Sequence, residues 1–565
     1  MGDLVRDSVF GQIVRTASGG KLLHWDEQVD PSYVDRYLGN DFSKNTADHG
    51  SPGEQNVEEK NRTSSPGSRS ASTSSTAQGG SNDELGGTKA DPEKGKDVHM
   101  VNWLDHDPQN PINWSIPKKF FVTFQICLLT FSVYVGSAIY SAGTLSVVQE
   151  FGVSQVAATL GLTLFVAGYG IGPMVWAPMS EIPYIGRNPV YLGTLVVFVV
   201  LQLAVIYAEN FGMLLAFRFI TGFVGSPVLA TGGASISDMY TPPKRAYGIS
   251  VWGLAAICGP VLGPLVGGFA AESKGWTWTI WELMWLSGAC LAFLIFFLPE
   301  TSSTNILYRR TRRLRKLTGN DKLTCEPEVE AEGMTGNDIV MMTLVRPFTL
   351  SFGEPIVFLL NLYIALVYGL LYIWFESFPI VFMELYGFSL GTEGLAFVGI
   401  LVGAFVVIPP FFWYVHKYIE PRFNENGELK PELRLTPSFV GAFCVPICLF
   451  WFGWSARPSV HWIMPIIGSG WFTIGAFLLF NSVLNYLGDA YPKYQASVLA
   501  GNDFMRSAFG AGFPLFANAM YRKLGVGWAS SLLGFLSIAF IPIPFVLYFY
   551  GERIRKRSKN ARHDL

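Results

Sequence analysis

The sequence predicts an all-α membrane protein with twelve transmembrane helices, arranged as two similar six-helix bundles. Half of the 565 residues are hydrophobic and only 15% are charged, whereas a soluble globular chain carries about 25% charged residues. The apolar residues are gathered in blocks of about 20, the length that crosses a hydrocarbon core about 30 Å thick. Basic residues concentrate in alternate loops, and one sequence pattern recurs in both halves of the chain.

Twelve apolar blocks are long enough to span a bilayer, six on each side of a polar, basic loop at 301–346. The first bundle is expected within residues 101–300 and the second within 347–551. The expected spans lie near 120–140, 157–178, 189–207, 213–235, 247–270, 279–298, 354–376, 392–414, 437–455, 461–487, 496–520 and 527–550.

Both ends of the chain are polar. Residues 1–100 are expected to form a disordered tail, because the stretch from Ser43 to Lys96 is rich in Ser, Gly, Thr, Asn, Asp and Glu. Such a stretch buries too little apolar surface to offset the entropy cost of ordering it. Residues 552–565 form a short basic tail. No cleavable signal peptide is visible, because charges break the apolar runs among the first 20 residues.

The charges in the loops predict the orientation. With the amino terminus inside, the expected inner loops hold most basic residues, including the cluster from Arg309 to Lys316. The expected outer loops hold few: Lys274, Arg457, Arg522 and Lys523. Because basic loops stay on the cytoplasmic side of a membrane, both termini are expected in the cytosol.

A repeat relates the two halves. Asp238-Met-Tyr-Thr-Pro-Pro-Lys follows the fourth block, and Asp489-Ala-Tyr-Pro-Lys follows the tenth. The two aspartates lie 251 residues apart, and the same offset brings a Gly-Pro pattern of the fifth block near Gly510 to Pro514. We infer two bundles related by a parallel repeat, with a path between them.

Charged residues within or beside the spans need partners. Glu181 and Arg187 flank a turn after the second span, where they can pair. Arg218 lies inside the fourth block, where a cation is costly unless it faces protein or water. It can bind a proton-carrying carboxylate or only cross-link helices by hydrogen bonds. Asp238 and Asp489 end their spans on the inner side and are expected to lock loops.

The fifth block has a dense pattern of glycine and proline. Glycines one helical turn apart permit close approach between helices, and the prolines bend the helix. The pattern comprises Gly259, Pro260, Gly263, Pro264, Gly267 and Gly268.

These motifs resemble those of the major facilitator superfamily, in the variant found in fungal drug:proton antiporters. The segment from Asp107 to Trp114 and Pro299-Glu300-Thr301 add to the resemblance, which covers residues 101–557. It implies proton-driven export of hydrophobic drugs such as azoles, benomyl and methotrexate across the plasma membrane.

The resemblance also implies roles for individual residues. Glu181 and Arg187 would hold the bundles together in the outward-facing state, and Arg218 would couple transport to protons. The Gly-Pro pattern of the fifth block is similar to a motif of exporters. This chain departs from the general loop motif, because Glu181 replaces an aspartate and Asn188-Pro189 replaces the second basic residue.

The seventh span is expected to contribute to a drug pocket. Such a pocket is mostly apolar and aromatic with a few polar groups, and aromatic rings can also bind cations. The candidate substrate-binding residues are Tyr363, Tyr368, Tyr372, Trp374, Phe375 and, in the tenth span, Asn481. Packing against lipid or protein is the alternative for each aromatic ring.

Three further residues are candidates for proton coupling. Glu376 lies near the outer end of the seventh span, where solvation of the helix end is the alternative role. Asp503 and Arg506 are three residues apart in the eleventh span, a spacing that permits a pair on one helix face. That pair can carry protons or only staple an inner gate.

No arrangement of residues indicates an enzyme. The sequence has no phosphate-binding loop, so we expect no ATP hydrolysis. We also expect no metal, cofactor or nucleic acid, and name hydrophobic drug-like substrates, protons and the lipid bilayer as partners. Two alternatives stay open: an exporter of a specific metabolite such as a polyamine or fungal toxin, and a membrane sensor that transports nothing.

Overall fold

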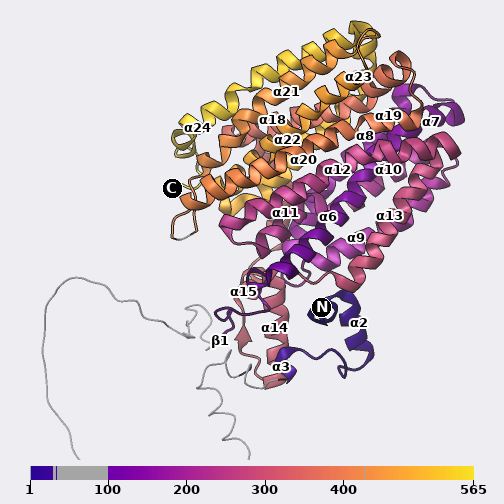
Figure 1. The fold of residues 1–565 in the computed structure, drawn as a ribbon. Coiled ribbons are helices and arrows are strands. Elements are labelled where there is room, and N and C mark those ends of the chain that lie inside the picture. The colour runs from indigo at the N-terminus through magenta and orange to yellow at the C-terminus, as the bar shows by residue number, and fades with distance from the viewer. Residues whose placement is uncertain (1, 30–33, 35–98, 426, 565) are drawn as a thin grey trace, which may run out of the picture.

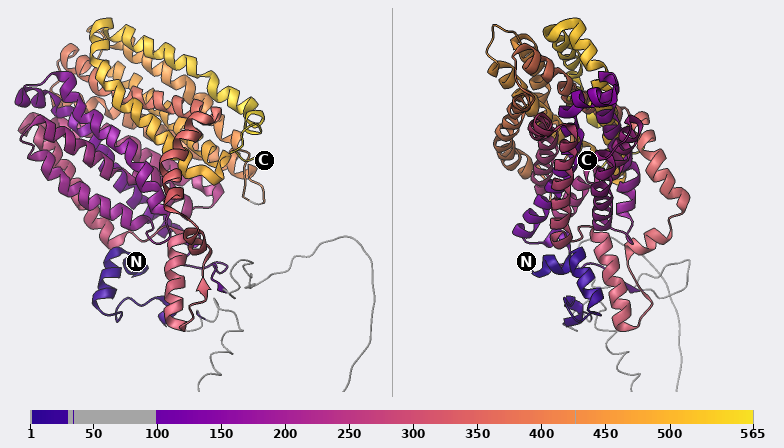
Figure 2. Two further views of the ribbon diagram at one scale, coloured as in Figure 1. Left: turned by 180° about the vertical axis from the view of Figure 1, so that it is seen from behind. Right: turned by 90° about the vertical axis from the view of Figure 1, so that its right-hand side faces the viewer.

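The computed structural model describes residues 2–29, 34, 99–425 and 427–564. Helices dominate these residues, and a short parallel pairing joins β1 (His99–Met100) to β2 (Leu323–Thr324). The long helices run side by side in two sets, one from each half of the chain (Figure 1). Two further views show the same division between the purple-magenta first half and the orange-yellow second half (Figure 2).

The first bundle contains six membrane-crossing segments. They are α6 (Ile116–Ala138), which continues through a 3-10 turn into α7 (Thr144–Phe151), α8 (Gln155–Glu181), α9 (Arg187–Ile206), α10 (Phe211–Gly225) with α11 (Pro227–Met239), α12 (Pro242–Lys274) and α13 (Trp276–Phe297). Each overlaps one apolar block that the sequence predicted.

The second bundle begins after α17 (Arg346–Gly353). It contains α18 (Pro355–Phe378), α19 (Leu390–Ala396) with α20 (Val398–Tyr414), α21 (Thr436–Ser455), α22 (Ile463–Ala490), α23 (Gln495–Phe540) and α24 (Pro542–Arg555).

Eleven helices among the described residues are long and apolar enough to span a membrane. The last, Ser497–Arg555, has 59 residues, far more than the roughly 20 that one crossing needs. Its helix is broken at Gly525, whose φ of 76° and ψ of 158° are not helical. This helix therefore crosses twice, which gives the twelve predicted spans.

The loop between the bundles carries α14 (Ser303–Thr318), α15 (Glu326–Glu332) and α16 (Gly336–Val340). We call the side of the molecule that carries α14 and both labelled chain ends the α14 face, and the other end of the bundles the opposite face (Figure 1).

The amino-terminal residues differ from the expected disordered tail. Residues 2–29 contain three helices: α1 (Gly2–Asp7), α2 (Val9–Ala17) and α3 (Asp26–Val29). The rings of Phe10 and Phe296 lie 4.8 Å apart, so α2 packs against the end of α13. The expected disorder of residues 35–98 falls outside the described residues.

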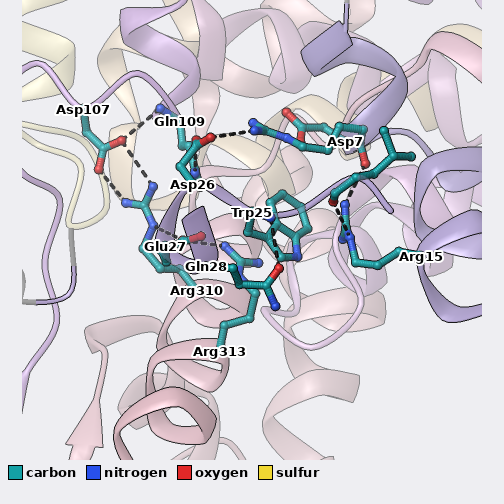
Figure 3. Close-up of polar contacts among 12 residues, drawn as sticks. Asp7, Arg15, Trp25, Asp26, Glu27, Gln28, Asp107, Gln109, Arg310 and Arg313 are labelled. Carbon is teal, nitrogen blue, oxygen red and sulfur yellow. Dashed lines mark hydrogen bonds and ion pairs between the residues drawn. The ribbon is translucent and has the colours of Figure 1, made fainter. Parts of the chain in front are cut away.

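A buried ion cluster holds this segment on α14 (Figure 3). Arg310 Nε lies 3.2 Å from Glu27 Oε1, and its Nη1 lies 2.5 Å from Asp107 Oδ2. Arg313 Nη2 lies 3.0 Å from the same oxygen of Glu27. Burial favours a higher pKa for Glu27, but Arg313 and Arg310 outweigh it and lower that pKa below its usual value. Glu27 and Asp107 therefore tie the chain on both sides of residues 35–98 to one arginine.

Candidate functional site

The site begins with a cavity between the two bundles, which we call the central cavity. Its walls come from α6 and α12 of the first half and from α18, α22 and α23 of the second. Apolar and aromatic side chains dominate, and the polar contributions are few. The lining includes Tyr134, Ile249, Trp252, Val367, Tyr368, Leu371, Phe472, Phe477, Phe480, Asn481 and Arg506.

A second cavity continues from the first toward the α14 face, and we call it the inner cavity. The two share Ile249, Trp252, Leu484 and Arg506. The inner cavity is more polar, and it reaches the segments that follow the fourth and tenth spans. Its lining includes Ser237, Arg245, Asn485, Asp489, Gln495, Asn502 and Asp503.

Asp503 and Arg506 form the predicted pair, and the pair is buried between the two cavities. Their residues are 2% and 7% exposed. Arg506 Nε donates to Asp503 Oδ1 at 2.8 Å, and Arg506 Nη2 donates to the hydroxyl of Tyr134 at 3.1 Å. Asp503 Oδ2 is buried without a hydrogen-bond partner in the described structure. The pair thus contacts the first bundle from the second.

Four buried hydroxyl groups form a further contact between the two bundles. The hydroxyl of Tyr169 on α8 lies 2.5 Å from that of Tyr368 and 2.9 Å from that of Tyr372, both on α18. The Tyr372 hydroxyl donates to Ser137 Oγ of α6 at 2.9 Å. We call these four residues the hydroxyl cluster. Because buried hydroxyls are costly unless hydrogen-bonded, the cluster favours the present contact between the halves.

The opposite face is closed by contacts between the halves. Glu376 of α18 accepts a hydrogen bond from Thr159 Oγ1 of α8 at 3.1 Å, and is 7% exposed. At the end of α12, a carboxylate oxygen of Glu272 accepts the backbone N–H of Gly391 at 2.7 Å. The cavities therefore reach toward the α14 face and not toward the opposite face.

The glycines of the Gly-Pro pattern in α12 approach two neighbouring elements, one in each bundle. A Cβ atom on Gly259, Gly263 or Gly267 would lie 2.6 to 2.8 Å from atoms of α6 or the turn after it, within the first bundle. A Cβ atom on Gly268 would lie 2.7 Å from the carbonyl oxygen of Leu390, in the second bundle. Pro260 and Pro264 lie inside the helix between these contacts. The absence of side chains thus permits close backbone approach within the first bundle and across the interface.

Arg218 is fully buried inside the first bundle. Its Nε and Nη2 donate to the backbone carbonyls of Gly161 and Gly136, each at 2.9 Å. Its guanidinium carbon lies 4.4 Å from the centre of the Phe165 ring and 4.8 Å from that of Tyr140. No salt bridge to Arg218 occurs among the residues described. This geometry cross-links α6, α8 and α10, and a role in proton coupling stays a prediction.

The predicted pair of Glu181 and Arg187 is not formed in this conformation. Arg187 Nη2 instead lies 2.9 Å from Asp238 Oδ2, and Glu181 is exposed. Glu300 fixes the turn by accepting the backbone N–H groups of Arg187 and Asn188, each at 3.1 Å. In this conformation Arg187 therefore makes its ion pair inside the first bundle, and the role of Glu181 and Arg187 in the outward-facing state stays a prediction.

The second bundle contains an ion pair equivalent to that of Arg187 and Asp238. Arg434 Nε lies 2.8 Å from Asp489 Oδ2, so each of the two repeated aspartates pairs with an arginine of its own half. A different pair joins the halves on the α14 face, where Lys244 Nζ lies 2.9 Å from Glu420 Oε1.

The candidate substrate-binding residues separate into three groups. Tyr368 and Asn481 line the central cavity, Tyr368 is also part of the hydroxyl cluster, and Tyr372 belongs to that cluster alone. The others pack against rings of the second bundle: Tyr363 on Phe540, Trp374 on Phe472 and Phe375 on Phe397.

Sequence reasoning missed Tyr134, Trp252 and Phe480 of the cavity wall. Their only signal was an aromatic ring within an apolar block, and many residues of this chain share it.

Comparisons with known proteins agree with the fold. The chain matches the model described as Major Facilitator Superfamily over residues 126–514. It is 46% identical over 469 residues to the transporter mfs1 of Schizosaccharomyces pombe, covering 82% of this chain and 88% of that one. It is 42% identical over 496 residues to the fluconazole resistance protein 1 of Saccharomyces cerevisiae, covering 87% and 88%.

Two further matches extend the comparison. The cycloheximide resistance protein of Candida maltosa is 37% identical over 580 residues, covering 99% of this chain and 100% of that one. Among solved structures, the proton:xylose symporter XylE bound to 6-bromo-6-deoxy-D-glucose has a TM-score of 0.54 at 16% identity, covering 77% and 96%. That similarity concerns the fold, whereas the sequence matches extend through both bundles. The chain therefore belongs to the Major Facilitator Superfamily.

Proposed function

We propose that this protein exports hydrophobic drug-like compounds from the cytosol in exchange for protons, by alternating access. The observation that carries the proposal is the central cavity, whose apolar and aromatic walls come from both bundles and end at the buried pair of Asp503 and Arg506. Apolar walls bind hydrophobic compounds by removing their surface from water. A buried carboxylate beside the cavity supplies a group that can bind a proton.

The relatives support the substrate class. Two of them are named for resistance to fluconazole and to cycloheximide, and export is a direct route to resistance. Few carboxylates line the central cavity, so the described residues offer little to a polyamine, the metabolite considered as an alternative.

The loop charges and the cavity support an orientation in the membrane, and the export direction rests on the resemblance of the Gly-Pro pattern of α12 to a motif of exporters. Basic loops on the α14 face favour a cytosolic position for that face and for both termini. The inner cavity then gives access from the cytosol, while contacts around Glu376 and Glu272 close the outer side. Rocking of the bundles about the central cavity would expose a bound compound to the outside. By resemblance, the membrane is the plasma membrane.

Asp503 is the proton carrier in this proposal. Ionised Asp503 pairs with Arg506, which also binds Tyr134 of the first bundle. Protonation removes the charge that holds the arginine, so it weakens a contact between the bundles. A change in the proton occupancy of Asp503 can therefore bias the equilibrium between the two access states.

The test is expression in a yeast strain that lacks its own drug pumps. We expect increased resistance to at least one of fluconazole, benomyl and methotrexate, and efflux that an uncoupler of the proton gradient abolishes. Asp503→Asn should lose uphill efflux while the protein still reaches the membrane. No resistance to any compound contradicts multidrug export, and efflux that persists with the uncoupler contradicts proton exchange.

A further inference from the structure

The hydroxyl cluster has features that packing alone does not require. Tyr169, Tyr368, Tyr372 and Ser137 are each at most 6% exposed. Phenylalanine rings would fill nearly the same space without the cost of burying hydroxyl groups. Here the hydroxyls converge from α6, α8 and α18 and bond to one another at 2.5 to 2.9 Å. They make a continuous chain of groups that each can donate and accept a proton.

Glu376 lies one helical turn along α18 from Tyr372, one end of the cluster. This residue follows Tyr372 by four positions on α18, so both side chains lie on the same helix face. The carboxyl accepts a hydrogen bond from Thr159 of α8, and no cation pairs with it among the described residues. An unpaired buried carboxylate is costly. In this closed conformation Glu376 is thus held without a charged partner among the residues described, in contact with the first bundle through Thr159.

The other end of the cluster reaches the central cavity. Tyr368 lines that cavity together with Tyr134 and Arg506, and the guanidinium carbon of Arg506 lies 5.6 Å from the centre of the Tyr368 ring. Arg506 holds Asp503, which has one carboxylate oxygen without a hydrogen-bond partner in the described structure. Tyr368, at the end of the chain of hydroxyls, and Arg506, the partner of this acceptor, thus line the same cavity.

We propose that Glu376 and the hydroxyls of Tyr372, Tyr169 and Tyr368 form a proton path from the opposite face to Asp503. Glu376 loses one proton, each hydroxyl accepts one and passes its own, and the carboxylate of Asp503 gains one. The last transfer needs a water molecule in the central cavity, which accepts a proton from Tyr368 and gives one to Asp503. The path conducts a proton while contacts between the halves keep the opposite face closed to larger solutes. This inference rests on the proposed function, because it supplies the proton that the export step uses.

The test uses the full chain in proteoliposomes with radiolabelled fluconazole and a pH-sensitive dye. Two assays run on each variant: proton uptake driven by fluconazole transport, and exchange of labelled for unlabelled fluconazole without a pH gradient. Tyr169→Phe, Tyr372→Phe and Glu376→Gln interrupt the path with little change in volume. Tyr486→Phe is the matched control, because this tyrosine of α22 is also buried and its hydroxyl has no partner in the described structure.

We expect coupled proton uptake to fall by at least about tenfold in the three path variants, while fluconazole exchange continues. A tenfold loss is a modest fraction of what positioned proton transfer contributes in enzymes. Tyr486→Phe should match the unmodified protein in both assays. Proton uptake in the path variants equal to that of Tyr486→Phe would overturn the proposal. Equal loss of exchange and proton uptake would also overturn it, since the hydroxyls would then only hold the bundles together. If the unmodified protein itself couples no protons to fluconazole, the proposed function has failed instead.

Discussion

Glu27→Gln should release the amino-terminal helices from α14. The Glu27 side chain is fully enclosed, and its oxygen Oε1 binds both Arg310 and Arg313. Removing one partner of a buried ion pair costs about 3–5 kcal/mol, because the remaining charge stays buried. At about 1.4 kcal/mol for each factor of ten, the lower figure increases the undocked population of residues 2–29 by roughly a hundredfold.

Hydrogen–deuterium exchange of residues 2–29 in detergent measures this release. The matched control is Asp26→Asn, one residue away. The ion pair of Asp26 with Arg6 is more exposed, with the Asp26 side chain 35% accessible, and such a pair contributes about 1 kcal/mol or less. We expect exchange to accelerate on the order of a hundredfold in Glu27→Gln and less than about tenfold in Asp26→Asn. Equal exchange in both variants would refute the assignment of docking to the buried cluster.

Three further outcomes are expected. Docking of residues 2–29 should weaken in acid, because the pKa of Glu27 is lowered in the folded state. The contribution of Glu27 to docking is full above the ordinary glutamate pKa of about 4.3 and is lost as the pH falls through the lower folded pKa. Protection of residues 2–29 from hydrogen exchange that is unchanged down to pH 3 would contradict this. Gly268→Val should oppose closure of the opposite face, because its Cβ would lie 2.7 Å from the Leu390 carbonyl oxygen. Labelling of a cysteine placed at Thr159, which is 3% exposed at the contact between the halves, should increase. Unchanged labelling would disprove the contact. Arg218→Met should lower the midpoint of thermal unfolding in detergent, because it removes two hydrogen bonds of a charged group worth about 1.5–3 kcal/mol each. An unaltered midpoint together with lost transport would contradict the structural role and favour a role of Arg218 in proton coupling.

The membrane spans were predictable because the bilayer imposes one requirement on every span. About 20 apolar residues are needed at each crossing, and local sequence shows them directly. The repeat at Asp238 and Asp489 was also informative, since each aspartate pairs with an arginine of its own bundle. The partner of Arg187 was harder to predict, because both Glu181 and Asp238 lie near it and the sequence gives no basis for choosing between them.

Two features depend on contacts between distant segments, so the sequence did not predict them. Helices as short as α1, α2 and α3 are not stable alone, and here α13 and the arginines of α14 hold them. The aromatic residues of α18 posed a different problem. This helix is buried on nearly all sides, so its periodicity does not separate Tyr368, which lines the cavity, from Trp374, which packs on Phe472.

The sharing of Arg310 by Glu27 and Asp107 has a practical consequence. The described segments before and after residues 35–98 are both held by one arginine, so the connection between them joins two points that are already fixed. Lengthening such a loop is inexpensive, with each doubling costing only about 0.6 kcal/mol. A fluorescent protein or affinity domain inserted between residues 35 and 98 would therefore leave the twelve spans undisturbed, and would provide a reporter without blocking either terminus.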